Sequence, residues 1–121
     1  MPSSTLFNQG DILLVPFPFT DQSGDKQRPA MVISAGWYNS AHKDLILAAI
    51  TSQIPSFLAR DELPLTPNDI SQASLIIPCI LLAGKLFSIE KSKIVKCLGK
   101  VSTQTRIDAL SKVRAILSDN S

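Results

Sequence analysis

The sequence contains few of the residues on which metal centres and acid–base catalysis depend: one histidine and two cysteines among 121 residues. Cys79 and Cys97 do not have the spacing of metal ligands, and a single pair is not a disulfide framework. Both cysteines lie in apolar runs, which predicts two buried, reduced thiols in an intracellular protein. The sequence therefore predicts neither a metal site nor a cofactor.

Long hydrophobic runs are also absent. The longest, Leu75–Ala83, is too short to span a membrane and is interrupted by Pro78. Residues 1–10 are polar and lack the apolar centre of a signal peptide. We therefore expect a soluble, cytoplasmic protein that does not contact a membrane.

The familiar catalytic motifs are missing as well. No glycine-rich phosphate loop and no nucleophile elbow occurs in the sequence. The only histidine, His42, lies between two predicted strands. Histidine is the commonest acid–base group of enzymes, but a lone loop histidine is more often a solvated surface residue.

The net charge of +2 is too small to indicate a nucleic-acid-binding protein by itself. The charge is unevenly distributed, because residues 85–100 contain five lysines and only one acidic residue, Glu90. Such an excess could steer a polyanion toward the protein. The simpler interpretation is a solvated face, which charge alone favours. The lysines occupy positions 85, 91, 93, 96 and 100.

What remains is typical of a globular protein, with 45% hydrophobic and 18% charged residues. The length predicts one domain, residues 1–121. Short apolar runs separated by Pro, Gly, Asp and Ser predict a series of strands, and Gly99 is expected to end the last of them. The predicted strands are Asp11–Pro16, Pro29–Ser34, Leu45–Thr51, Leu63–Leu65, Lys85–Ile89 and Ile94–Leu98.

Only the last segment has a clear helical pattern. Ile107, Leu110, Val113 and Leu117 recur at helix spacing, and Ser102 is a suitable N-cap. Several short strands followed by one amphipathic helix predict a mainly β fold: a small, strongly bent antiparallel sheet or barrel with a C-terminal helix.

The most informative stretch is Gly10–Ser34. A strand enters a polar loop that contains Phe17 and Phe19, and the chain returns through Arg28 into a second strand. The planar, permanently charged guanidinium suits a phosphate, and phenylalanines beside it can stack on bases. Alternatively, both rings pack the end of the sheet and Arg28 forms a surface ion pair. The residues alone leave both interpretations open.

Three segments resemble the MazF/PemK family of toxins. The first reads GDILLVPFPFTD and then KQRPAMVIS within Gly10–Ser34, the second reads AITSQ at 49–53, and the third runs from Pro78 to Ser102 and ends in LGKVS. They occur in the family's order and, with the last helix, span most of the chain from Gly10 to Leu117. Each motif is moderately specific; the ordered set is considerably more so.

The resemblance implies an SH3-like antiparallel barrel that forms a homodimer and cuts single-stranded RNA without a metal. The family's catalytic arginine corresponds to Arg28 and its catalytic threonine to Thr51. The resemblance also implies a cognate antitoxin, for which we expect an acidic C-terminal segment. RNA contacts are expected from the segments around the two catalytic residues: Phe17, Phe19, Thr20, Lys26, Ser52, Gln53 and Lys85.

Two departures from the family pattern keep alternatives open. Lys85-Leu86-Phe87 stands where many members carry a glutamine–hydrophobic–arginine triplet, although one branch of the family shares it. Neither Asp21 nor Asp25 matches the acid or histidine that some members place near the arginine, so no general base is assigned. The alternatives are a toxin of the same fold that binds DNA gyrase without catalysis, and an RNA-binding protein without cleavage.

Overall fold

The computed structural model describes residues 6–17, 26–65, 70–71 and 78–119. Seven strands, two α-helices and one short 3-10 helix make up its regular structure. Within these ranges no helix is both long and apolar enough to cross a bilayer. In chain order the elements are β1 (Asp11–Pro16), β2 (Gln27–Val32), α1 (Gly36–Ala41), β3 (Asp44–Thr51), β4 (Glu62–Leu65), β5 (Ile70–Ser71), β6 (Cys79–Glu90), η2 (Lys91–Lys93), β7 (Lys96–Val101) and α2 (Thr103–Ile116).

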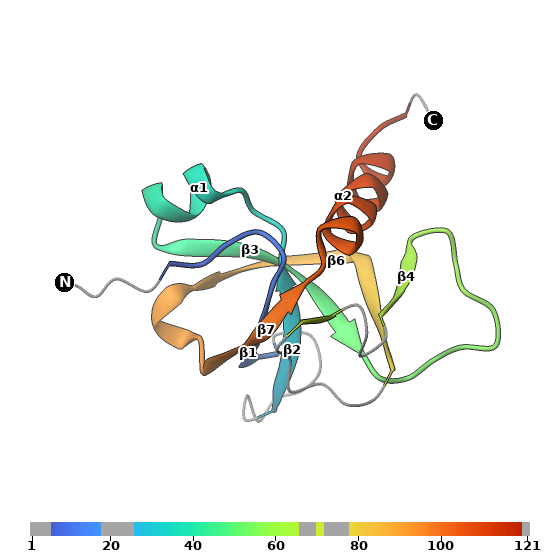
Figure 1. The fold of residues 1–121 in the computed structure, drawn as a ribbon, viewed down its shortest axis with the longest axis horizontal. Helices are drawn as coiled ribbons and strands as arrows, with labels where there is room; N and C mark the ends of the chain where they lie inside the picture. Colours follow the sequence, from blue (N-terminus) through green and yellow to red (C-terminus); the bar gives the residue numbers. More distant parts are fainter. Residues whose placement is uncertain (1–5, 18–25, 66–69, 72–77, 120–121) are drawn as a thin grey trace.

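All seven strands belong to one antiparallel sheet in the order β4-β6-β3-β2-β1-β7-β5 (Figure 1). The two edge strands, β4 and β5, are consecutive in the chain. Leu65 at the end of β4 is only five Cα steps from Ile70, which limits the gap to about 18 Å. The two edges therefore have to approach each other, and the sheet curls. This confirms the predicted bent antiparallel fold with a C-terminal helix.

The bend in the sheet is concentrated in β6. Ala48 pairs with Leu86, but the next residue of β3, Ala49, pairs with Leu82, so β6 contains three residues with no partner in β3. An irregularity of this kind bends a strand and re-aims its side chains. β6 can consequently pair with β3 along the whole of β3 and also with β4 on its other side.

The sheet buries apolar side chains on both faces. On the helix-covered face, the buried cluster includes Ile12, Met31 and Leu81 together with Ala109 and Val113 of α2. The opposite face, here called the site face, is formed by the residues that alternate with these along the strands. Its buried members are Leu13, Val15, Ala30, Val32, Leu45 and Leu47, with Phe7, Phe87, Ile89 and Ile94 packed against them.

Helix α2 lies against β6 and β4 (Figure 1). The predicted cap is confirmed, because the Ser102 side chain accepts a hydrogen bond of 3.2 Å from the Thr105 N–H. The expected apolar stripe is wrong in part: the buried positions are Thr105, Ala109 and Val113, whereas Ile107 and Leu117 are exposed. Small residues spaced four apart let the helix approach the sheet closely.

Several predicted boundaries and environments need correction. Lys85–Ile89 is the second half of the longer strand β6. Gly99 does not end a strand: it lies inside β7 at φ 142°, next to the place where β7 carries an extra residue opposite β1. Cys79 is buried as expected, but Cys97 is exposed, because it alternates with the buried Leu98 along β7.

Short elements complete the described structure. Between β2 and β3 the chain forms the short helix α1, and residues 53–60 have no helix or strand. The edge strand predicted at Leu63–Leu65 is β4. The two-residue strand β5 had no sequence signal, because two residues are too few to display a period.

Candidate functional site

The hairpin of β1 and β2 places Arg28 beside Phe17. Val15 pairs with Arg28 across the hairpin, and the Phe17 N–H donates a 3.0 Å hydrogen bond to the Lys26 carbonyl. Phe17 follows Val15 by two residues, so its side chain is the diagonal neighbour of Arg28 on the same face. The guanidinium lies over the ring, with Cζ 5.2 Å from the ring centroid. This is a cation–π contact.

A second ring supports the first. Phe87, on β6, meets Phe17 edge to face, with 6.4 Å between centroids and an interplanar angle of 88°. Phe87 pairs with Leu47 across the sheet and packs on the buried cluster of the site face. Phe87 therefore packs on the site-face core, Phe17 contacts Phe87, and Arg28 lies over Phe17.

Arg28 keeps hydrogen-bonding capacity unused. Its Nε atom is buried and has no hydrogen-bond partner among the described residues. Buried donors are normally satisfied, and an unmet one marks a strained or functional position. The negative face of the Phe17 ring offsets part of this cost.

Thr51 ends β3 on the far side of β2 from Phe17. It pairs with Ile80 of β6, and its hydroxyl oxygen accepts a 3.2 Å hydrogen bond from the Gln53 N–H. Because that oxygen already accepts from the backbone, the hydroxyl proton is oriented away from Gln53 and can be donated to another group. The turn after β3 thus fixes the position of a hydroxyl that can donate to a ligand.

Lys85 belongs to the three residues of β6 that have no partner in β3. The bend displaces it from the ladder and brings it toward the ends of β2 and β3. A hollow of about 300 Å³ forms where these elements meet, here called the site hollow. It is lined by Phe17, Arg28, Ile50, Thr51, Gln53, Leu82 and Lys85.

Most of the described residues predicted for the site meet in this hollow. Lys26 lies two positions before Arg28, and Ser52 lies between Thr51 and Gln53, but both are exposed and do not line the hollow. Phe19 and Thr20 fall outside the described residues, as do Asp21 and Asp25. Ile50, Leu82 and Phe87 were missed; only the Lys85-Leu86-Phe87 triplet carried a signal for the last of these.

The other lysines of the predicted basic stretch do not converge on the site. Lys91 and Lys93 lie in η2, where the Lys91 ammonium donates to the Asn39 carbonyl, and Lys96 and Lys100 lie on β7. Lys85 alone among the five lines the site hollow. The five lysines therefore do not form one basic cluster at the site hollow.

His42 is also remote from the site hollow. Its ring stacks on Tyr38 at 4.1 Å, and it lines a separate hollow with Lys43 and Glu90. Between His42 and Thr51 lies the whole of β3, about 25 Å of extended chain. His42 is therefore not placed to exchange protons with a group bound beside Arg28.

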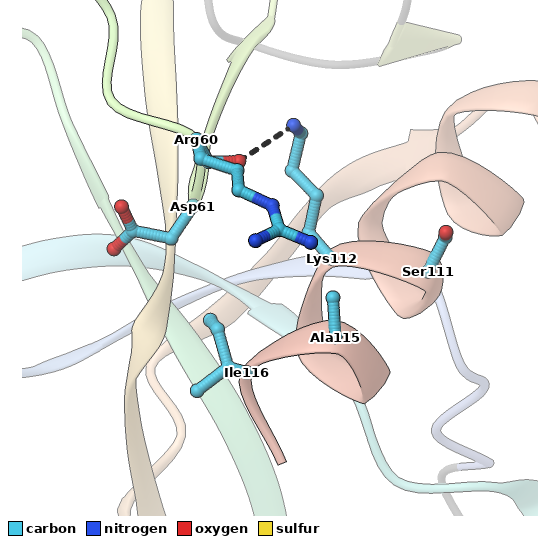
Figure 2. A pocket seen from close by; sticks show the side chains of 6 residues that line it. All are labelled: Arg60, Asp61, Ser111, Lys112, Ala115 and Ile116. Carbon is cyan, nitrogen blue, oxygen red and sulfur yellow. Dashed lines mark hydrogen bonds between the residues drawn. The ribbon is translucent and has the colours of Figure 1, made fainter. Parts of the chain in front are cut away.

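A larger hollow of about 440 Å³ lies between α2 and the start of β4 (Figure 2). Arg60 and Asp61 line one side of it and Lys112 and Ile116 of the helix the other, and the Lys112 ammonium donates a 2.9 Å hydrogen bond to the Arg60 carbonyl. This hydrogen bond ties the helix to the turn that precedes β4. The hollow contains none of the predicted site residues, so volume alone does not identify the site.

No set of three or more histidine, cysteine, aspartate or glutamate side chains within the described ranges is arranged to hold a metal ion. The site hollow offers instead a guanidinium, an ammonium and an oriented hydroxyl. These groups bind anions. The hollow is thus suited to a phosphate group with the Phe17 ring beside it.

The curled antiparallel sheet and the C-terminal helix form a fold that this chain shares with solved MazF structures. Residues 8–117 match the family model described as the PemK-like, MazF-like toxin of type II toxin–antitoxin systems. The chain belongs to this family and is a toxin of a type II toxin–antitoxin system. None of the curated protein sequences matches the chain significantly.

Solved structures share the fold at low sequence identity. A MazE–MazF complex from Deinococcus radiodurans has a TM-score of 0.72 and 20% identity, over 93% of this chain and 97% of that one. A mycobacterial endoribonuclease in complex with its cognate antitoxin has a TM-score of 0.67 and 17% identity, over 90% and 95%. The Mycobacterium tuberculosis toxin MazF-mt6 gives 0.67 and 17%, over 90% and 98%.

Proposed function

We propose that the chain, acting as a single domain over residues 1–121, is a metal-independent endoribonuclease that cuts single-stranded RNA. One observation carries the proposal. Arg28, Thr51 and Lys85 come from three separate strands, yet they line one hollow. Two of them are the residues that the family resemblance assigns to catalysis, and the third supplies a further positive charge.

In the proposed reaction the nucleophile is the RNA's own 2′-hydroxyl. Its oxygen forms a bond to the adjacent phosphorus and loses its proton, while the bond from phosphorus to the 5′-oxygen breaks and that oxygen gains a proton. The products are a 2′,3′-cyclic phosphate and a free 5′-hydroxyl. No metal and no other co-reactant is needed.

The described residues of the hollow act on charge and position. Negative charge collects on the non-bridging oxygens in the transition state, where Arg28 and Lys85 stabilise it. The Thr51 hydroxyl donates to the same phosphate and fixes its orientation. The lining residues include neither a carboxylate nor an imidazole, so we assign them no proton transfer.

We also propose two protein partners. Solved relatives are described as complexes with a cognate antitoxin or with MazE, and we expect an antitoxin here too, with an acidic C-terminal segment that competes with RNA for the positive hollow. We further expect a homodimer at micromolar concentration. Phe57 and Leu117 are 90% and 73% exposed, and a second copy could cover such apolar surface.

The direct test is cleavage of a 5′-labelled single-stranded RNA of mixed sequence in EDTA. We expect cleavage to persist, and the downstream fragments to accept phosphate from a polynucleotide kinase because they carry a free 5′-hydroxyl. Arg28→Ala protein, purified in parallel, controls for contaminating nuclease. Cleavage only after Mg²⁺ or Mn²⁺ is added would contradict the mechanism, and tight binding of RNA without any cleavage would contradict the proposed activity.

A further inference from the structure

Arg28 is held by a ring and not by an ion pair in the described structure. Its Cζ lies 5.2 Å from the Phe17 centroid, and its buried Nε atom has no hydrogen-bond partner among the described residues. A long side chain held in this way keeps its orientation only while the ring keeps its own. The orientation of Phe17 therefore decides where the guanidinium edge points.

The Phe17 backbone is fixed by its hydrogen bond to the Lys26 carbonyl, but this bond does not set the angle of the ring. Phe87 does so, because its ring meets Phe17 at 88° with centroids 6.4 Å apart. This geometry is the edge-to-face arrangement that aromatic pairs favour. Phe87 is itself packed against the site-face core and paired with Leu47, whose side chain is fully buried.

We propose that Phe87 is a positioning residue for Arg28: it fixes the Phe17 ring, which in turn aims the guanidinium into the site hollow. Phe87 is absent from the lining of the hollow, so it acts through Phe17 and not on the phosphate. The inference rests on the proposed function for its effect on cleavage, although the orientation of Arg28 can be measured without RNA.

This arrangement suits a phosphate site better than an ion pair between Arg28 and a carboxylate would. A salt bridge would occupy N–H donors of the guanidinium and neutralise its charge. Stacking on a ring restrains the guanidinium plane and leaves its edge donors available. The two rings therefore supply order without consuming the charge on which the proposed chemistry depends.

The alternative is that Phe87 only fills space on the site face. Ile89 offers a matched control, because it lies on the same face of β6, is also half-buried, and packs on the same cluster. No aromatic contact connects it with Phe17. A purely structural role predicts similar consequences for truncating either residue, whereas positioning predicts that Phe87 alone affects Arg28.

The first measurement is steady-state cleavage by Phe87→Leu, Phe87→Tyr and Ile89→Val. We expect Phe87→Leu to lower kcat on the order of tenfold with little change in KM, short of the hundredfold that a 1 Å misplacement can cost. Phe87→Tyr, which keeps the ring, should restore most of the rate, and Ile89→Val should leave it unchanged. Phe87→Met substitutes for the leucine variant if the latter folds poorly. Equal losses in the Phe87 and Ile89 variants would overturn the inference.

A double-mutant cycle adds a condition that a structural role cannot meet. Phe87→Leu should lower the rate of the normal enzyme but not the residual rate of Arg28→Ala, because the residue that it positions is then absent. The same loss in both backgrounds would overturn the inference.

The second measurement is independent of cleavage. The Nε–Hε group of Arg28 should give a resolved ¹⁵N–¹H signal, shifted by the Phe17 ring and identified by its loss in Arg28→Ala. We expect Phe87→Leu to move or broaden this signal and Ile89→Val to leave it in place. An unchanged signal in Phe87→Leu would overturn the inference. A normal protein that cleaves no RNA would overturn the proposed function alone, with the NMR result still deciding the role of Phe87.

Discussion

Both faces of the sheet bury apolar residues, but they differ in what lies at their edges. The helix-covered face is closed by α2, and the hollow beside it contains a lysine tied to a backbone carbonyl. The site face ends in the rings of Phe17 and Phe87 and in Arg28, whose buried Nε atom has no hydrogen-bond partner among the described residues. On the first face the Lys112 ammonium stabilises the fold, whereas on the second the Arg28 guanidinium lines a hollow that can hold a ligand.

From this contrast we expect Arg28→Ala to cause the largest loss in the rate of RNA cleavage. Loss of one preorganised charge donor typically costs about 3–4 kcal/mol of transition-state stabilisation, or two to three orders of magnitude in rate. The free energy of unfolding should change by less than about 1 kcal/mol, because Arg28 is half-buried and its Nε atom has no hydrogen-bond partner to lose. Cleavage kinetics and urea unfolding of the same preparation check both parts.

Two controls sharpen that result. Arg28→Lys keeps the charge but loses the planar fork and its stacking on Phe17, so its rate should lie between those of the normal protein and Arg28→Ala. Lys112→Ala removes a positive charge from the hollow beside α2 and should leave the rate unchanged. Near-normal turnover by folded Arg28→Ala protein would refute the assignment of the site.

A smaller effect is expected for Thr51→Val, which keeps the β-branched shape that suits the end of a strand and removes only the hydroxyl. A hydrogen bond to a charged group contributes about 1.5–3 kcal/mol, which corresponds to a rate lower by roughly one to two orders of magnitude. The Gln53 N–H loses its acceptor, but it is exposed and water can replace it. If Thr51→Val cleaves at the normal rate, the hydroxyl does not contact the phosphate.

How far the sequence predicts this molecule depends on the range of the interactions involved. β1 begins and ends at the predicted residues, since an apolar run bounded by a glycine and a loop is a local signal. The Ser102 cap was likewise predictable from residues within four positions of it. That Arg28 and Thr51 belong to the same site was expected only from the family resemblance, because no local sequence pattern connects residues on two different strands.

The features that escaped prediction depend on tertiary contacts. The unpaired residues of β6 break its period, so one long strand appeared as an apolar run and a separate short strand. The aromatic pair joins Phe17 and Phe87, which are 70 positions apart, and no local pattern connects the two residues. The buried side of α2 is set by the closeness of its approach to the sheet, which favours Ala109 over the larger Ile107.

The helix-covered face should respond in the opposite way to the site. Ile12 is fully buried there, at the end of the β1–β2 pairing remote from Arg28. Ile12→Val removes one buried methyl group and should lower the free energy of unfolding by about 0.5–1.5 kcal/mol. The rate per folded molecule should not change. Urea unfolding and active-site-normalised kinetics test this, and a fall in rate with unchanged stability would contradict the separation of the two faces.

The smallest effect is expected at Asp11, which alternates onto the site face at the end of β1 opposite the hollow. Its carboxylate accepts a 2.9 Å hydrogen bond from the Asn8 N–H and is 8% exposed. Burial raises the pKa of Asp11 above its ordinary value, although the Asn8 hydrogen bond and the charge of Lys100 act in the lowering direction. A raised pKa in the folded state means that the protonated carboxyl is the better fit, so its stabilising contribution is complete at acidic pH and is lost as the pH rises through the folded-state value.

Asp11→Asn supplies a neutral side chain with an acceptor in the same place. We therefore expect the free energy of unfolding of the variant, relative to the normal protein, to be higher at pH 7 than at pH 3, as measured by urea unfolding at both values. Its rate of RNA cleavage should be unchanged. A relative stability that is constant with pH, or that falls toward pH 7, would show that the hydrogen bond and Lys100 outweigh burial at this position.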